Sequence, residues 1–142
     1  MKFYIACDHA GYNIKDSVIE ILKKYGNDVV DLGTNSNERV DYPDFAHKLS
    51  RAVLDDEGSN GLLICGTGIG MSLAANKHKG IRATLCHDAY TAKMAKAHND
   101  ANVLCFGERV VGLGVAESII QAWCETDFEG GRHANRVKKI EL

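Results

Sequence analysis

The chain has 142 residues, of which 17 are basic and 19 acidic, and its formal net charge is −2. This length fits a single domain, residues 1–142, that is large enough to bury a core without disulfide or metal staples. The balanced charge excludes the strongly basic surface of proteins that bind nucleic acid or anionic membranes, and it favours a small molecule or another protein as partner.

The chain begins with a short apolar run that ends before Asp8 and His9, and no apolar stretch approaches the length of a membrane span. We therefore expect no signal peptide, no membrane helix and a cytoplasmic location. The cysteines are odd in number and widely spaced, which is typical of reduced thiols. They are Cys7, Cys65, Cys86, Cys105 and Cys124.

Apolar runs predict five strands in chain order. They lie near Phe3–Cys7, Asp28–Leu32, Gly61–Cys65, Ile81–Cys86 and Asn102–Phe106. Apolar residues at helical spacing predict helices between and after them, in the segments 14–25, 45–53, 70–76, 89–97 and 113–126. The only proline, Pro43, precedes the second of these helices, for which Asp44 is the expected cap.

Strands that alternate with helices along the whole chain predict an α/β fold. We expect a single Rossmann-like, doubly wound domain: a five-stranded parallel sheet in the order 2-1-3-4-5, with helices on both faces and a C-terminal helical arm. Ligands of such sheets bind beyond the carboxyl ends of the strands, where the strand order reverses. Here that point lies between the first and the third strand.

Two chemically distinctive loops follow these two strands. Asp8–Gly11 leaves the first strand, and Cys65–Met71 leaves the third with a thiol and three glycines before a helix. Backbone N–H groups and the positive end of a helix suit an anion and favour a thiolate. The residues alone leave a structural alternative open, in which Cys65 is a buried core residue in front of a tight turn and Asp8 caps a helix.

Five sequence strings together resemble the type B ribose-5-phosphate isomerases, and the resemblance covers essentially the whole chain. They are Cys7–Gly11, Asp41–Asp44, Cys65–Ser72, His98–Val103 and Gly130–His133. The resemblance implies that ribose 5-phosphate and ribulose 5-phosphate are interconverted through an enediolate, without metal or cofactor. It also implies a homodimer or a dimer of dimers. Met71 stands where a related branch has a glutamate, so the chain resembles the cysteine branch.

The resemblance assigns catalytic roles to five residues. Cys65 is the expected base for the proton transfer, which a thiolate at a helix terminus can perform, and Thr67 orients it or donates to the substrate. His98 assists ring opening, a task for a group that titrates near neutrality, with Asp8 as its partner. Asn99 and the backbone N–H groups of the glycine-rich loop stabilise the enediolate charge.

The resemblance also implies a set of substrate-binding residues. The phosphate ligands are His9, Arg109, Arg132 and Arg136, because guanidinium groups bind phosphate through charge-assisted hydrogen bonds. Tyr42 lines the sugar site. The full expected set is Asp8, His9, Tyr42, Gly66, Thr67, Gly68, Ile69, Gly70, Asn99, Arg109, Arg132 and Arg136. Without the resemblance, His98 is read as a helix-end cation and the last two arginines as a solvated helix face.

No metal site is expected. The histidines form no H-E-x-x-H pattern, the cysteines are not paired, and no carboxylates cluster at helical spacing. His133 lies in the last of the five strings, but no role is assigned to it.

Two alternatives stay open. One concerns the substrate, and the other concerns whether the chain is an enzyme. The chain could be an allose 6-phosphate or galactose 6-phosphate isomerase, which share the chemistry. It could also be a non-catalytic phosphosugar-binding domain, because a fold does not fix a function. Retention of Cys65, His98 and Asn99 argues against the latter.

The positions of the two catalytic groups predict a shared site. The helix that starts near Ala89 runs back across the sheet, so it carries His98 roughly 13 Å away from the edge where Cys65 lies. We therefore expect the partner chain of a two-fold dimer to supply His98 and Asn99 to each active site.

Overall fold

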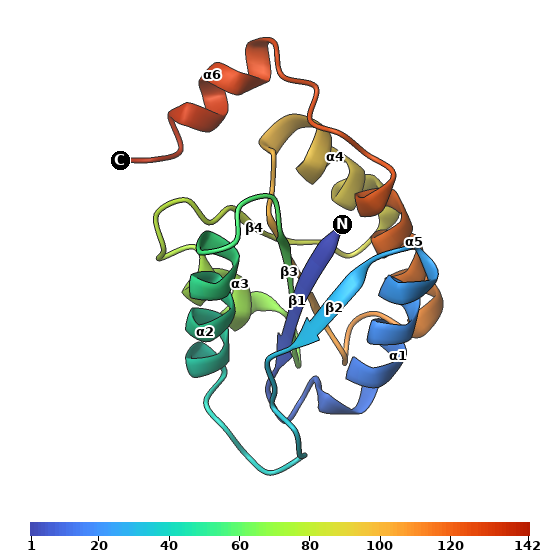
Figure 1. Cartoon of the computed structure of the whole chain (residues 1–142). Helices are drawn as coiled ribbons and strands as arrows, with labels where there is room; N and C mark the ends of the chain where they lie inside the picture. Colours follow the sequence, from blue (N-terminus) through green and yellow to red (C-terminus); the bar gives the residue numbers. More distant parts are fainter.

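The computed structural model describes residues 1–142. Its strands are β1 (Lys2–Cys7), β2 (Asp28–Asp31), β3 (Asn60–Cys65), β4 (Ala83–Leu85) and β5 (Val103–Gly107). Its helices are α1 (Tyr12–Lys24), α2 (Tyr42–Leu54), α3 (Ile69–Ala75), α4 (Ala89–Asn99), α5 (Leu113–Cys124) and α6 (Arg132–Lys138). Every strand pairing is parallel, and helices cover both faces of the sheet (Figure 1). The predicted α/β architecture is confirmed.

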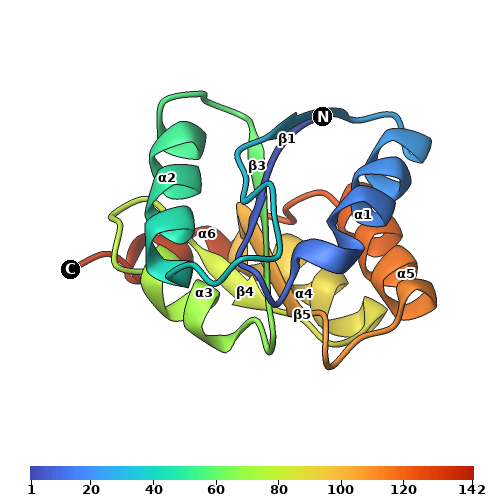
Figure 2. The ribbon, with the colours of Figure 1, turned by 90° about the horizontal axis from the view of Figure 1, so that it is seen from below.

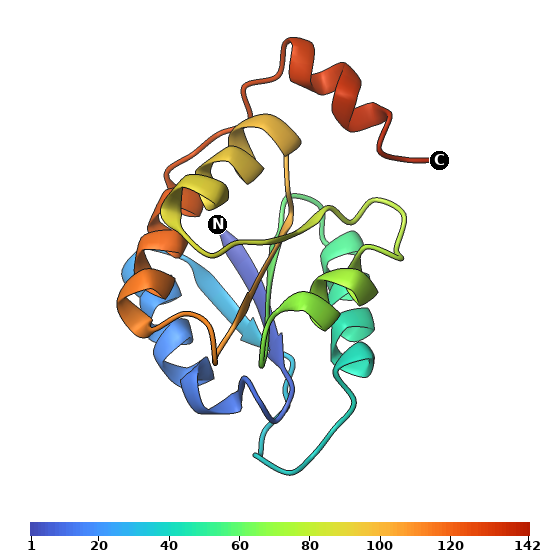
Figure 3. The same ribbon diagram turned by 180° about the vertical axis from the view of Figure 1, so that it is seen from behind.

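The sheet separates two apolar cores. Helices α1, α4 and α5 pack on one face, where Val18, Leu22 and Ile119 join the side chains of the strands. Helices α2 and α3 pack on the other face, as Figure 3 also shows from behind. All six residues of β3 are buried, because the central strand of a parallel sheet is covered on both sides.

The observed strand order is β2-β1-β3-β5-β4, so the predicted order 2-1-3-4-5 is wrong at one place. Strand β5 pairs with β3 on one side and with β4 on the other. Burial explains the exchange: all five residues of β5 are buried, whereas β4 has only three residues, two of them half-buried, which suits an edge. The order still reverses between β1 and β3.

The start of α2 also differs from the prediction. Asp41 occupies the N-cap position and Pro43 lies in the first turn, where its missing N–H costs nothing. Asp44, the expected cap, lies inside the helix, where its carboxylate is favourable near the positive end of the helix dipole.

Helix α6 forms the expected C-terminal arm. It lies beyond the end of α4, at the side of the molecule away from the strand arrowheads (Figure 1). His133 is its one buried residue, and the Glu141 carboxylate accepts a hydrogen bond of 2.9 Å from the backbone N–H of Gly80. None of the helices has the length and apolar composition of a membrane span.

A buried lysine fixes the loop after β2 to helix α1. The Lys15 side chain is 2% exposed, and its ammonium group donates to the Asp31 carboxylate at 3.0 Å and to the Thr34 carbonyl at 2.5 Å. Because a buried charge is tolerated only when it is paired, these contacts hold the segment that crosses the carboxyl edge of the sheet.

We predict that Lys15→Met lowers the free energy of unfolding by about 1–3 kcal/mol, because it leaves the Thr34 carbonyl without its ammonium donor and removes the ion pair with Asp31, whose carboxylate keeps only the Gly33 N–H. Urea unfolding measures the change. The control is Lys24→Met, which removes an exposed ion pair with Glu117 and should cost less than about 0.5 kcal/mol. Equal losses in the two variants would contradict this role of Lys15.

Candidate active site

The carboxyl ends of β1, β3 and β5 carry three loops that are tied together by backbone hydrogen bonds. The Asp8 N–H donates to the Ile64 carbonyl at 3.3 Å, the Glu108 N–H to the Cys65 carbonyl at 2.9 Å, and the Arg109 N–H to the Gly66 carbonyl at 3.1 Å. Figure 2 views the molecule from below and looks onto this edge. The loops therefore form one structural unit at the point where the strand order reverses.

Cys65 lies at the centre of this unit. Its side chain is buried, and the backbone N–H of Gly68 donates a hydrogen bond of 3.0 Å to Sγ. An N–H directed at the sulfur stabilises negative charge on it. Gly68 directs its N–H toward the sulfur because it adopts φ +80°, a conformation that favours glycine. A Cβ at this position would also lie 2.6 Å from the Leu85 side chain, so only glycine fits.

The other buried thiols have a different environment. Burial raises the pKa of the Cys7 thiol to about 11, and it raises that of Cys105 well above its usual value. Burial likewise raises the pKa of Cys86 and Cys124. Burial thus disfavours the thiolate at these four positions, whereas a backbone N–H is directed at the sulfur of Cys65, the candidate nucleophile or base.

The loop that holds the sulfur also carries backbone donors without a partner. The N–H groups of Gly66, Thr67 and Gly70 donate to no atom of the chain. The N–H of Ile69 is taken by the Thr67 hydroxyl at 3.2 Å, and Thr67 itself is exposed. Unpaired N–H groups next to a thiol can bind an oxyanion, as the sequence predicted for this loop.

Two larger side chains flank the loop. The Tyr42 ring lies against Gly70, where a Cβ would come within 2.6 Å of its Cζ, and the Arg109 guanidinium lies next to Gly66, 3.1 Å from the position of a Cβ. The two side chains are exposed on the surface. Both thus lie where the sequence placed sugar and phosphate ligands.

His9 and Asp8 lie on the neighbouring loop after β1. The Nδ1 atom of His9 accepts a hydrogen bond of 3.2 Å from the Val40 N–H, so the proton of the neutral ring is on Nε2, which can donate to an anion. The buried Asp8 carboxylate accepts from the N–H groups of Ala10 and Gly11 at 2.9 and 3.2 Å. Asp8 therefore closes a turn in front of α1, whose N-cap is Gly11.

Sequence reasoning missed one residue that stabilises this edge. The Glu108 carboxylate accepts a hydrogen bond of 2.9 Å from the Ile14 N–H in the first turn of α1. This contact joins the loop after β5 to the helix after β1 and suits the positive end of the helix. The only signal in the sequence is the position of Glu108, two residues after the end of a predicted strand.

The remaining predicted residues, His98, Asn99, Arg132 and Arg136, lie at the opposite edge of the sheet. The chain that follows α4 pairs there with the first residues of β3, because the Asn102 carbonyl accepts from the Gly61 N–H at 2.8 Å. The five steps from Asn60 to Cys65 span about 16 Å. Figure 1 places α6 and the end of α4 at this amino edge. The structure thus does not bring these residues and Cys65 together within one chain.

His98 stacks on His133 at the amino edge. The ring centroids are 4.2 Å apart at an interplanar angle of 11°, and Glu129 lies beside both rings. Burial, and then the neighbouring His98, lower the pKa of His133. Sequence patterns do not reveal this group, because its members lie on different elements.

A doubly wound parallel sheet with a thiol and free N–H groups at its switch point is an arrangement typical of α/β domains that bind anionic ligands. The family model described as Ribose/Galactose Isomerase matches residues 3–140. The chain is 48% identical to ribose-5-phosphate isomerase B of Escherichia coli K12 over 98% of this chain and 93% of that protein.

Solved structures are equally similar. A ribose-5-phosphate isomerase B of Clostridium thermocellum is 54% identical with a TM-score of 0.95 and covers 99% of this chain and 95% of its own. The type B ribose 5-phosphate isomerase of Trypanosoma brucei is 48% identical with a TM-score of 0.95, and the match covers 98% of this chain and 95% of that one. The chain belongs to the Ribose/Galactose Isomerase family.

We predict that Gly107→Ala destabilises the protein by about 1–3 kcal/mol, the range for overpacking. Its Cβ would lie 2.5 Å from the Gly66 carbonyl oxygen and from Thr67, so the loop that carries the free N–H groups must shift. Gly112→Ala is the control, because no atom lies within 4 Å of its Cβ position. Chemical unfolding compares the two variants, and a loss confined to Gly112→Ala would refute the packing argument.

Proposed function

We propose that this chain is an isomerase that interconverts ribose 5-phosphate and ribulose 5-phosphate through an enediolate. The observation that carries the proposal is the sulfur of Cys65, which accepts a hydrogen bond from the Gly68 N–H in a loop whose other backbone N–H groups include three without a partner in the chain. The names of the relatives, ribose-5-phosphate isomerase B among them, support the pentose phosphate substrate. The proposed reaction uses no metal or cofactor.

The proton transfer follows from the geometry of the loop. The Cys65 thiolate removes the proton from C2 of the open-chain aldose and returns it to C1, while the hydroxyl proton passes from O2 to O1, so the carbonyl group moves from C1 to C2. Negative charge appears meanwhile on the substrate oxygens. The free N–H groups of Gly66, Thr67 and Gly70 are fixed in advance where that charge develops, which lowers the barrier.

The phosphate ligands come from both edges of the sheet. His9 and Arg109 lie near Cys65, whereas Arg132 and Arg136 lie on α6, with His98 and Asn99 close by on α4. We propose that a second copy of the chain supplies this second set. A two-fold axis would place the amino-edge residues of each protomer at the carboxyl edge of the other, and both sites would then be complete.

A six-carbon substrate is the second candidate, because the family model covers ribose and galactose isomerases. Turnover of ribose 5-phosphate, allose 6-phosphate and galactose 6-phosphate at equal concentrations distinguishes the two candidates. We expect the five-carbon substrate to have the highest kcat/KM. No turnover of any sugar phosphate would favour a binding domain.

We predict that Cys65→Ala lowers turnover by about 10²–10⁴-fold, the contribution of a general base. The variant should still bind the sugar phosphate, because the phosphate ligands remain. Alkylation should inactivate the wild-type protein, and substrate should protect it. Cys124→Ala, which removes a half-buried thiol far along the chain, is the control and should keep its activity. Full activity of Cys65→Ala would eliminate Cys65 as the base.

The shared site is tested by subunit mixing. Cys65→Ala and His98→Asn should each be nearly inactive, but unfolding and refolding them together should restore about a quarter of the wild-type activity. This value follows because half of the random dimers are mixed, and each mixed dimer has one intact site. Mixed dimers that are isolated and remain inactive would show that both groups act within one chain.

A further inference from the structure

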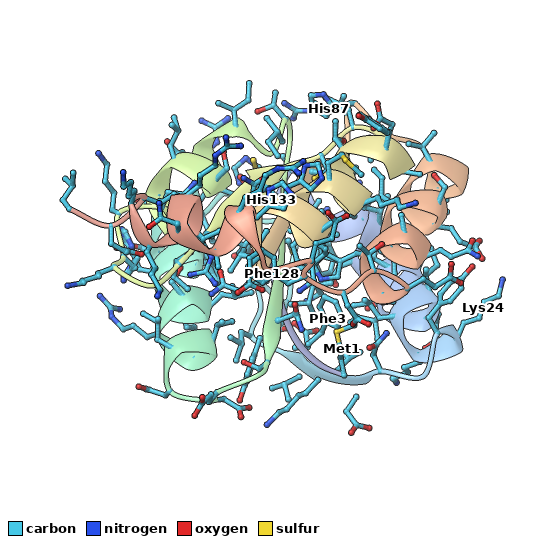
Figure 4. All side chains as sticks on the ribbon, turned by 90° about the horizontal axis from the view of Figure 1, so that it is seen from above. Met1, Phe3, Lys24, His87, Phe128 and His133 are labelled. Carbon is cyan, nitrogen blue, oxygen red and sulfur yellow. The ribbon has the colours of Figure 1, made fainter.

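Three side chains from separate elements converge at the amino edge of the sheet. His98 lies in the last turn of α4, His133 lies in α6, and Glu129 precedes the turn into α6. The Glu129 Oε1 atom is 3.8 Å from Nε2 of His98 and 3.5 Å from Nε2 of His133. Figure 4 shows His133 close to the ribbon of α4, among other nitrogen-bearing side chains. Each of these residues offers one potential metal-ligand atom to the cluster.

We propose that His98, Glu129 and His133 form a binding site for a divalent transition-metal ion, with Zn²⁺ as the preferred ion among those common in proteins. Their donor atoms all lie within 4.8 Å of one another. Two imidazoles and one carboxylate are a donor set that zinc accepts, and a fourth position stays open. The proposal differs from the sequence prediction, which found no metal pattern because the first histidine is 31 residues before the glutamate in the chain.

The spacing of the donors fits a tetrahedral ion. Zinc bonds of about 2.1 Å at tetrahedral angles place neighbouring donor atoms about 3.4 Å apart. The distance between Glu129 and His133 is 3.5 Å, and that between Glu129 and His98 is 3.8 Å, so shifts of a few tenths of an ångström suffice for these two pairs.

The two rings must move relative to each other on binding. A metal ion lies in the plane of an imidazole that binds it, and the rings are stacked at only 11°. His98 is the ring that can rotate, because its side chain is 38% exposed, whereas that of His133 is 9% exposed. Burial also lowers the pKa of His133, which favours the neutral ring that a metal ion requires.

The other pair of histidines in the chain does not offer an equivalent site. Nδ1 of His47 and Nε2 of His78 are 2.6 Å apart and share a hydrogen bond, and no acidic or thiol group completes a cluster with them. A donor pair at this distance must open before it can hold one ion, and it would supply only two ligands.

Metal binding has a functional consequence that rests on the proposed function. An ion that takes Nε2 of His98 removes this ring from proton transfer, so it should inhibit sugar ring opening. The inhibition would be reversible, because a chelator that removes the ion returns the ring. Mg²⁺ should have no such effect, since it prefers oxygen ligands to imidazole.

The test is a calorimetric titration of the full chain with Zn²⁺ alone, without substrate. We expect one ion per chain for the wild type and an affinity at least about tenfold weaker for Glu129→Gln, because loss of a ligand costs no less than loss of its supporting contacts. Glu129 is exposed, so the variant should fold normally. His78→Gln is the matched control and should bind zinc like the wild type. The imidazole resonances of His98 and His133 should shift together on binding.

The outcomes separate the site from the function. No zinc binding by the wild type, or equal binding by Glu129→Gln, would overturn the metal site; equal binding would direct attention to another ligand such as Cys65. Zinc binding that depends on Glu129 supports the site. If turnover by the zinc-bound protein were undiminished, the metal site would still be supported, but the role of His98 in the proposed reaction would be contradicted.

Discussion

Parallel pairing of all the strands is the constraint on which the rest of the structure depends. Because each strand points the same way, each helix between strands must return across a face of the sheet, and the two edges acquire different chemistry. The loops after β1, β3 and β5 gather the thiol and the free N–H groups at one edge. The ends of α4 and α6 gather histidines and arginines at the other. The separation of these two groups of residues is therefore a property of the topology.

Close backbone packing shapes the edge that holds the thiol. Gly107 lets β5 approach the loop after β3, and Gly68 turns its N–H toward the sulfur. A side chain at either position would push apart groups that must be fixed before a substrate arrives. Leaving N–H groups without partners costs free energy. Burial of the surrounding strands, whose residues are almost all buried, offsets this cost.

Local patterns predicted most of the fold. Apolar runs located β1, β3 and β5 to within a residue or two at each end, because buried parallel strands are continuously apolar. The fourth strand was predicted over Ile81–Cys86 and spans Ala83–Leu85, since an edge strand can be shorter than its apolar run. Strand order failed because it depends on which strand is better buried, a comparison across the whole chain.

The candidate site, like the fold, could be predicted only in part from the sequence. Parallel geometry alone brought Asp8 and Cys65 to one edge, so their proximity could be predicted from two loops. The stack of His98 on His133 could not, because it depends on the turn at Gly130 and Gly131. Both glycines have positive φ and set the direction of α6, and no periodic pattern encodes that direction.

Helix α6 buries little of its surface against its own chain, so its folding would depend on pairing with a second chain. A helix of seven residues is too short to be stable alone in water, and His133 is the one residue that it buries in its own chain. In the proposed dimer, the partner would supply the missing contacts, so ordering of the arm and pairing of the chains would be one equilibrium. Dilution would then dissociate the dimer and at the same time release the arginines of the arm from their fixed positions. The affinity for substrate would therefore depend on the protein concentration.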